Sequence, residues 1–407
     1  MEHHLLLTLA GGLAAALVLG YITLRLGLSP IVGYLLAGII IGPHTPGFVG
    51  DEKLASEMAE IGVILLMFGV GLQFHLHELI AVRKVAVPGA LFQVAAATAL
   101  GAVAGHAFGW SWTGGIFFGI AISIASTVVL IRVLADQGAL QRPEGRIAIG
   151  WLVVEDLFTV LALVLLPSIL SGEGHGNLGW ALAVAVGKLA LLTAVLFIAG
   201  KRAIPWILHQ VEAAGQELFM LAVLVLALTI AIGAAKFFGA SMALGAFLAG
   251  MVIGQSPFAT RAASEVLPFR DAFAVLFFVS VGMLLDPSEL PSQWQLIAVT
   301  MIIILLGKPL AALLVTRVLG QPFAVGISIA ASLAQIGEFS FILAVLGRNL
   351  GVLPPEGMNI LVAASILSIT LNPLLYRWAG PLATWVGRKP ALDRWLNPPS
   401  ARSSALK

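Results

Sequence analysis

Long apolar runs follow one another along almost the whole chain, separated by short polar or Gly/Pro-rich breaks. An apolar stretch of about 20 residues is long enough to cross a bilayer as an α-helix. The pattern therefore predicts an all-α polytopic membrane protein with 13 transmembrane helices. They are expected near 5–25, 29–42, 54–73, 84–108, 112–136, 145–168, 178–200, 216–236, 240–255, 271–286, 294–319, 321–348 and 357–380.

Composition supports a membrane protein and excludes several kinds of chemistry. Of the 407 residues, 59% are hydrophobic and 10% are charged, whereas soluble domains carry about 25% charged residues. This argues against nucleic-acid binding and cytosolic metabolism. The chain has no cysteine, so disulfides, thiolate metal sites and cysteine nucleophiles are excluded. It also lacks HExxH, GxSxG, Walker and GxGxxG motifs, and we expect neither an enzyme nor a bound cofactor.

The basic residues are distributed unevenly between the two sides of the predicted membrane. Lys and Arg accumulate in the cytoplasmic loops of membrane proteins. The opposite loops hold only Lys53, Lys236 and Arg348. We therefore expect the N-terminus outside and the C-terminus in the cytoplasm. One set of alternate loops and the C-terminal tail hold 17 of the 22 basic residues: Arg25, Arg83, Lys84, Arg132, Arg142, Arg146, Lys201, Arg202, Arg261, Arg270, Arg317, Arg377, Arg388, Lys389, Arg394, Arg402 and Lys407.

Short segments recur in the same order in the two halves of the chain. Such small-xxx-small patterns also arise by chance, because they let membrane helices approach closely. Three matches at a nearly constant offset favour a duplication. The matched segments are GYLLAGIIIG at 33–42 with GAFLAGMVIG at 245–254, FGVGL at 68–72 with SVGM at 280–283, and GIAISIAS at 119–126 with GISIAASL at 326–333.

The duplication divides a transmembrane domain at 1–386 into repeat one (1–170), a linker helix (178–200) and repeat two (216–386). Equivalent spans are seven apart, an odd number, so the two repeats cross the membrane in opposite senses. Inverted repeats of this kind are typical of secondary transporters, whose binding sites lie at the bilayer midplane between the repeats.

Five ionisable side chains fall within predicted spans: Glu155, Asp156, Lys188, Lys308 and Glu338. A charge at the centre of a span costs roughly 2.5–3.5 kcal/mol on insertion scales, so such residues are rare and usually functional. Lys188 has no signature around it, and we interpret it as a lysine that reaches the membrane interface. The other four are candidates for a site.

Glu155 and Asp156 are adjacent and lie about ten residues past Arg146, which places them near the middle of the bilayer. Two close carboxylates in a low dielectric cannot both carry a charge cheaply, so one tends to hold a proton near neutral pH. Such a group can exchange a proton for a monovalent cation. Asp156 is the stronger candidate, since Glu155 is either a second ion-binding group or the member of an ion pair.

Lys308 stands at mid-span before Pro309, which perturbs the helix by removing a backbone hydrogen bond. A buried lysine readily loses its proton unless it is paired. Lys308 is therefore expected to hold Glu155 or Asp156 in a salt bridge, either released when a cation binds or purely structural. Glu338 is either its partner or a second proton-binding group.

The spans at 112–136 and 321–348 carry small polar residues at matching depth. Broken helices of transporters expose backbone carbonyls and half-helix ends at this depth, where they bind ions. Ser126, Thr127, Gln335 and Glu338 are therefore expected as further ion ligands in unwound helices. The alternative is ordinary packing in which the hydroxyls bond to their own helix.

Six segments in the right order resemble the Kef-type members of the monovalent cation:proton antiporter-2 family. The Glu155–Asp156 pair is most similar to the YbaL-type branch, and residues 307–310 resemble the lysine segment of sodium/proton antiporters of the same superfamily. The segments are GYLLAGIIIGP at 33–43, ILLMFGVGL at 64–72, ASTVVL at 125–130, GWLVVEDL at 150–157, FFVSVGM at 277–283 and AQIGEFS at 334–340.

The resemblance implies an NhaA-like fold with crossed unwound helices, a dimerisation domain, a mobile core domain and a homodimer. It also implies Asp156 as the ion-binding aspartate and Lys308 as the core lysine. Two departures stand out. Many Kef proteins have Gln where Glu155 stands here, and they usually continue into a cytoplasmic nucleotide-binding regulatory domain. We expect that domain to be absent from this chain, in which 387–407 form a short cytoplasmic tail.

We therefore expect a secondary transporter that exchanges a monovalent cation, K⁺ first and Na⁺ second, for protons across a bacterial inner membrane. The alternative is a gated K⁺ channel or uniporter on the same fold, and a symporter for an organic anion is a third hypothesis. The expected partners are the cation, the proton, the lipid bilayer and a second copy of the chain.

Overall fold

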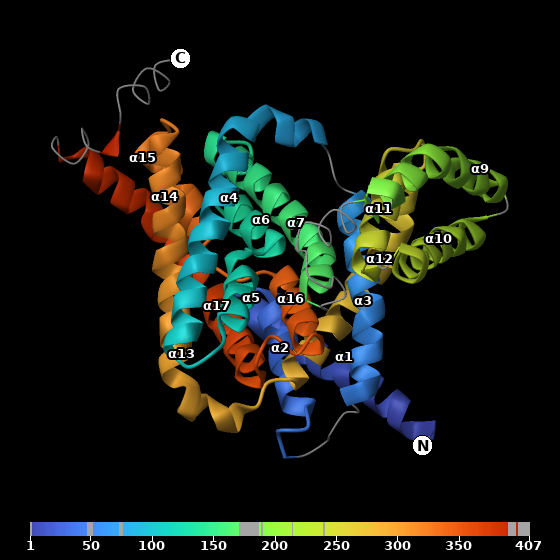
Figure 1. Ribbon diagram of the computed structural model, residues 1–407, viewed down its shortest axis with the longest axis horizontal. Helices are drawn as coiled ribbons and strands as arrows, with labels where there is room; N and C mark the ends of the chain where they lie inside the picture. Colours follow the sequence, from blue (N-terminus) through green and yellow to red (C-terminus); the bar gives the residue numbers. More distant parts are fainter. Residues whose placement is uncertain are drawn as a thin grey trace. The chain divides into compact units, whose positions relative to one another are not determined.

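The computed structural model describes residues 2–46, 52–72, 76–170, 187–188, 190–213, 215–238, 241–389 and 396–397 (Figure 1). Within these ranges every regular element is a helix and there is no β-strand. The α-helices are α1 (Glu2–Arg25), α2 (Pro30–Ile41), α3 (Glu52–Leu72), α4 (Leu76–Ala107), α5 (Trp112–Ser123), α6 (Thr127–Asp136), α7 (Pro143–Leu170), α9 (Lys201–Glu212), α10 (Gln216–Phe238), α11 (Met242–Gly254), α12 (Ala259–Met283), α13 (Leu290–Ile302), α14 (Lys308–Val318), α15 (Phe323–Ser332), α16 (Glu338–Asn349) and α17 (Pro355–Gly387). Two π-helical turns, Leu196–Gly200 and Ile303–Gly307, and a 3₁₀ turn, Pro287–Glu289, complete the elements.

Seven described helical stretches are long and apolar enough to cross a membrane, or eight if the bent pair Ala190–Ile198 and Lys201–Glu212 is one span. The protein is thus a multi-span helical membrane protein. Helices lie at every predicted span; of the span at 178–200, residues 187–188 and 190–200 are helical, and residues 178–186 and 189 lie outside the described residues. The number 13 itself stays a prediction, because α2, α11 and α15 are apolar but short.

Some predicted boundaries were wrong because hydropathy detects only the apolar part of a helix. α12 begins at Ala259 rather than near 271, and its polar first turns include an ion pair of 3.0 Å between Arg261 and Glu265. Such i,i+4 pairs favour helix formation. The helix α9 was not predicted at all. It is amphipathic, with Ile204 and Leu208 buried while Lys201 is exposed, and such a surface helix carries too little apolar sequence to register as a span.

The span predicted at 294–319 is one long helical path whose winding changes in the middle. α13 ends at Ile302, the turn Ile303–Gly307 is π-helical, and α14 begins at Lys308. Pro309 in the first turn of α14 has no N–H to donate to the preceding turn, so a standard α-helical ladder cannot continue through it. Wide turns of this kind are frequent at functional positions of helices.

The chain divides into two compact units. One comprises residues 1–17, 40–75 and 160–283 and contains α3 and α9 to α12. The other comprises residues 18–39, 76–159 and 284–407 and contains α4 to α6, most of α7, and α13 to α17. All of the candidate site residues belong to the second unit.

Glycines of the two GxxxAGxxxG segments bring helices into close contact within each unit. A Cβ on Gly33 would lie 2.5 Å from the carbonyl oxygen of Leu19 on α1, and a Cβ on Gly250 of α11 would overlap the carbonyl oxygen of Phe68 on α3. Small residues at such contacts let helix backbones approach, which is how membrane helices gain packing energy.

Candidate functional site

Two helices of the second unit are interrupted at their centres, where the sequence predicted broken helices. α5 ends at Ser123 and α6 begins at Thr127, while α15 ends at Ser332 and α16 begins at Glu338. The side chain of Ser126 starts α6 by accepting a hydrogen bond from the N–H of Val129 at 3.3 Å. A serine at this position supplies the acceptor that the first turn of a helix lacks.

The two interruptions are hydrogen-bonded to each other. The N–H of Ser126 donates to Gln335 Oε1 and Gln335 Nε2 donates to the carbonyl of Ser126, both at 3.0 Å. The N–H of Gly337 donates to the carbonyl of Ile124 at 3.0 Å, and Ser340 Oγ donates to the same carbonyl at 3.4 Å. These bonds satisfy backbone groups that the bilayer core leaves without water. Ser126 and Gln335, expected as ion ligands, therefore hold the crossing together.

Gly337 is required by the closeness of this crossing. A Cβ at this position would lie 2.5 Å from the carbonyl oxygen of Ala125 and 2.8 Å from the N–H nitrogen of Ser126. The backbone of Gly337 is extended, with φ −101° and ψ 171°, a conformation open to any residue. Glycine is needed here because a side chain would clash with the neighbouring backbone, and not because of its backbone conformation.

α7 presents its two carboxylates to the α5–α6 interruption. Glu155 Oε2 accepts a hydrogen bond of 2.8 Å from the N–H of Ala125. Asp156 Oδ2 accepts one of 3.4 Å from Thr127 Oγ1. Both carboxylates are buried, with exposed fractions of 0% and 8%. Asp156 Oδ1 is also buried and has no hydrogen-bond partner in the part of the chain that the structure describes.

Lys308 reaches the other interruption from α14. It is fully buried, and its Nζ donates a hydrogen bond of 2.9 Å to the carbonyl of Gln335. The carboxylate that interacts electrostatically with this ammonium is Glu155. Asp156 instead lies in the field of two negative neighbours, Glu338 and Glu155. The adjacent acids therefore occupy opposite electrostatic surroundings.

Helix ends contribute to these surroundings. The first turn of a helix carries a partial positive charge, which favours carboxylates nearby. Glu155 and Asp156 bond to residues 125 and 127 at the start of α6, and Glu338 is itself the first residue of α16. Three acids thus gather where two half-helices begin.

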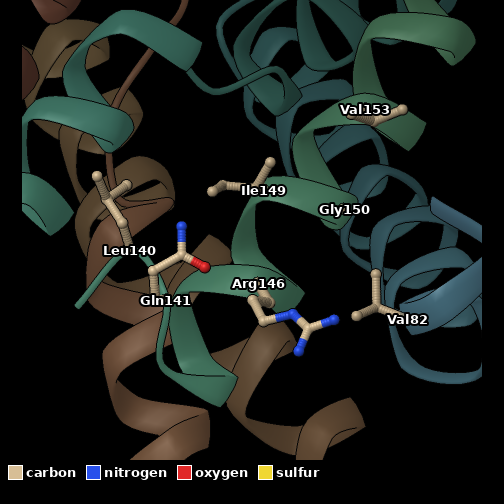
Figure 2. Close-up of a pocket in the computed structure, with 7 residues that line it drawn as sticks. All are labelled: Val82, Leu140, Gln141, Arg146, Ile149, Gly150 and Val153. Atoms are coloured by element: carbon tan, nitrogen blue, oxygen red, sulfur yellow. The ribbon is translucent and has the colours of Figure 1, made fainter. Parts of the chain in front are cut away.

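A cavity of about 430 Å³ lies along α7 on the Arg146 side of the carboxylates (Figure 2). Val82 of α4, Leu140 and Gln141 of the α6–α7 connection, and Arg146, Ile149, Gly150 and Val153 of α7 line it. Ile149 and Val153 precede Asp156 by seven and three residues, so they share its face of the helix. The lining residues of α7 thus lead along the helix toward Asp156. Among the described lining residues, Arg146 is the charged one.

Several polar residues around the site were not found by sequence reasoning. Ser368 Oγ of α17 accepts from the N–H of Ile336 at 3.3 Å, and Asn372 Nδ2 donates to the carbonyl of Ala331 at 2.9 Å. On the other side, Gln93 and Trp151 form a buried hydrogen bond of 3.2 Å. The signal available was a neutral polar residue inside an apolar span, which charge-based reasoning passes over. Lys188 is exposed and is not part of the site.

Buried carboxylates and a lysine at the junction of two interrupted helices define an ion-coupled membrane transporter. A family model described as the transmembrane sodium/hydrogen exchanger matches residues 13–379. The chain belongs to this family of cation/proton antiporters.

Two relatives and one solved structure extend the comparison. The chain is 51% identical over 383 residues to the YbaL cation/proton antiporter of Escherichia coli, covering 92% of this chain and 69% of that protein. It is 32% identical over 386 residues to K(+) efflux antiporter 4 of Arabidopsis thaliana, covering 94% of this chain and 64% of that protein. The fold matches the sodium proton antiporter MjNhaP1 of Methanocaldococcus jannaschii with a TM-score of 0.70 at 19% identity, covering 94% of this chain and 99% of that one.

Proposed function

We propose that this protein exchanges a monovalent cation, K⁺ before Na⁺, for protons across the cytoplasmic membrane of a bacterium by alternating access. The observation that carries the proposal is the buried Asp156 oxygen for which the described residues supply no hydrogen-bond partner. Leaving such an acceptor unsatisfied is costly, so a bound proton or cation lowers the free energy of the site. K⁺ comes first because K(+) efflux antiporter 4 is related over 94% of the chain.

Competition for Asp156 would produce the exchange. A proton and a monovalent cation each neutralise one carboxylate charge, so each displaces the other from the same oxygen atoms. The hydroxyl of Thr127, 3.4 Å from Asp156 Oδ2, is positioned to serve as a second oxygen ligand. States with Asp156 occupied change their access from one side to the other, because an unneutralised charge is costly to carry through the low-dielectric interior.

Glu155 is assigned a different role in transport from Asp156. Its carboxylate accepts the N–H of Ala125 and is attracted by the ammonium of Lys308, whereas Asp156 has no positive side chain among its charged neighbours in the described part of the chain. We assign Lys308 to coupling: a cation arriving at Asp156 brings a second positive charge near the ammonium and weakens its hold on Glu155. Glu338 adds negative charge that favours a cation at Asp156.

The cavity in Figure 2 supports a cytoplasmic route to Asp156. Its volume of about 430 Å³ is room for several water molecules. Arg146 lies among the basic residues that predict the cytoplasmic side. The cavity is therefore proposed as the vestibule through which cytoplasmic cations and protons arrive.

The proposed architecture has 13 transmembrane helices in two inverted repeats, with interleaved core and dimerisation subdomains in a homodimer. The two helix interruptions support the repeat, because Ser126 and Gln335 are 209 residues apart, close to the offset between the GxxxAGxxxG segments. The charge distribution supports an N-terminus outside and a C-terminus in the cytoplasm.

The test is transport by purified protein in proteoliposomes with an imposed pH gradient. Wild-type protein is expected to dissipate the gradient on addition of K⁺, and Asp156→Asn is expected to abolish this, because an amide cannot exchange a proton for a cation. The matched control is Asp136→Asn at the exposed end of α6. As a surface change it should alter the rate by no more than about twofold.

Two outcomes would contradict the proposal. Wild-type exchange by the Asp156→Asn variant, with its thermal unfolding unchanged, would remove Asp156 from the site. Cation flux indifferent to the proton gradient, or unitary currents in a planar bilayer, would favour the gated channel or uniporter instead.

A further inference from the structure

Gln93 connects three helices beside the candidate site. It lies within α4 and is fully buried. Its Nε2 donates a hydrogen bond of 2.9 Å to the carbonyl of Ser123, the last residue of α5. Its Oε1 accepts one of 3.2 Å from the indole Nε1 of Trp151 on α7. Both ends of one carboxamide are therefore used, and each has its partner on a different helix.

The carbonyl of Ser123 needs such a partner because α5 stops there. The last four carbonyls of a helix have no intrahelical donor, and the core of a bilayer offers no water in exchange. The next residue, Ile124, is extended with φ −83° and ψ 130°, so the chain turns away from the helical ladder. Gln93 supplies the missing donor at the point where the interruption begins.

Trp151 is held in a slot built for it. It is completely buried, and a buried indole N–H requires an acceptor. Gly89 lies one turn before Gln93 on α4 and faces the indole, which a Cβ at Gly89 would overlap. Glu155 follows Trp151 by one helical turn on the same face of α7, so its carboxylate lies beside the indole.

These contacts close a ring around the α5–α6 interruption. Gln93 holds the carbonyl of Ser123, Glu155 holds the N–H of Ala125 two residues later, and Trp151 connects the Glu155 face of α7 back to Gln93. We propose that Gln93 is a positioning residue of the exchange site, which fixes the start of the interruption against the carboxylates of α7. The inference deepens the proposed function and rests on it.

The chemistry of the carboxamide makes the proposal specific. This ring of contacts needs one hydrogen-bond donor and one acceptor on the same side-chain group, which Gln supplies and Leu does not. A protonated Glu side chain also supplies one of each, but an ionised one has no donor for Ser123. Gln93→Leu should therefore remove both hydrogen bonds of Gln93 at every pH. Gln93→Glu should lose the bond to Ser123 only where the new carboxyl group is ionised.

The experiment measures turnover and the cation KM of proteoliposomes across a pH series for wild type, Gln93→Leu and Gln93→Glu. Displacing catalytic groups by about 1 Å can cost about 100-fold, so we expect Gln93→Leu to lower turnover by about 10- to 100-fold. Gln93→Glu should approach wild type at acid pH and fall toward Gln93→Leu as the pH rises. Thermal unfolding of Gln93→Glu measured at each pH separates this result from unfolding caused by the buried charge.

Normalisation to wild type at each pH removes the titration of groups common to all variants. On the helices packed against α4 near Gln93, these are Glu155 and Asp156 of α7 and Lys308 of α14, since α5 and α13 carry no titratable side chain. The matched control is Gln293→Leu, the same substitution at a half-buried residue of α13. It should leave both the rate and its pH profile unchanged.

Hydrogen–deuterium exchange provides a readout that does not depend on transport. Gln93→Leu should speed exchange of the Ala125 amide, because its acceptor Glu155 is no longer held in register. Unchanged turnover in Gln93→Leu, or a Gln93→Glu profile parallel to wild type, would overturn the inference. If wild-type protein shows no cation-dependent proton movement, the proposed function fails, and exchange at Ala125 still decides the role of Gln93.

Discussion

Glu155 and Asp156 are adjacent on α7 and experience opposite environments. The carboxylate of Glu155 accepts the Ala125 N–H and faces the Lys308 ammonium, whereas Asp156 has the hydroxyl of Thr127 and two negative neighbours. Adjacent residues of a helix point about 100° apart, so the two carboxylates face different neighbours. One acid therefore has a positive charge nearby, while the other has negative neighbours that favour a bound cation.

The pairing of Glu155 with Lys308 predicts a non-additive pair of substitutions. The carboxylate and the ammonium attract each other without a direct salt-bridge contact, and removing one of two buried opposite charges leaves the other without its compensation. We expect Glu155→Gln and Lys308→Met each to lower the apparent thermal unfolding midpoint in detergent, and the double variant to recover much of the loss. Additive losses in the double variant would mean that the two charges do not stabilise each other.

Sequence reasoning selected the charged residues of the candidate site and passed over the neutral ones around it for a physical reason. A charge inside an apolar span is expensive, so Glu155, Asp156 and Lys308 stood out without any structure. A buried amide such as Gln93 is cheap once both of its ends are bonded. Its partners are a backbone carbonyl 30 residues away and an indole 58 residues away, and nothing local in the sequence marks either contact.

At the scale of the elements, the site depends on two interruptions fitting against each other. The sequence predicted both breaks from small polar residues at matching depth. It did not predict that the carboxamide of Gln335 pairs with the backbone of Ser126 across 209 residues. Which residues pair across the crossing depends on how the two backbones pack against each other. It also explains why Ser126 and Gln335, expected as ion ligands, are engaged in the crossing.

The closeness of the crossing gives a test at Gly337. In Gly337→Ala the new methyl group would press on the carbonyl of Ala125, and overpacking of this kind costs about 1–3 kcal/mol. We expect a lower unfolding midpoint and impaired exchange, because the strain falls on the segment that carries the site.

The control for this variant is Gly380→Ala in α17, an exposed glycine where a Cβ would meet nothing within 4 Å. Replacing Gly by Ala in an exposed helix stabilises by up to about 1 kcal/mol, so this variant should be neutral or slightly more stable. If both variants behave alike, the crossing tolerates a side chain and the close approach is not required.

At the scale of the whole molecule, the charges fall into two groups with different consequences. Most Lys and Arg residues lie in loops and tails, where they predict the direction in which the chain crosses the membrane. Only a few were predicted at mid-span, and of these Lys308 is buried in the candidate site while Lys188 is exposed. The first group predicts topology, and the second predicts chemistry.

The topology can be measured directly because the chain contains no cysteine. A single cysteine at Gln137, exposed in the α6–α7 connection, should react with a membrane-impermeant maleimide only in inverted vesicles. One at Arg348, exposed near the end of α16, should react only from outside intact cells. The expectation follows from the excess of basic residues in the loops on the Gln137 side. Labelling of both from the same side would mean that the number of spans between residues 137 and 348 is even rather than odd. The inverted relation of the two repeats would then be wrong, although the hydrogen-bonded crossing around Asp156 would still stand.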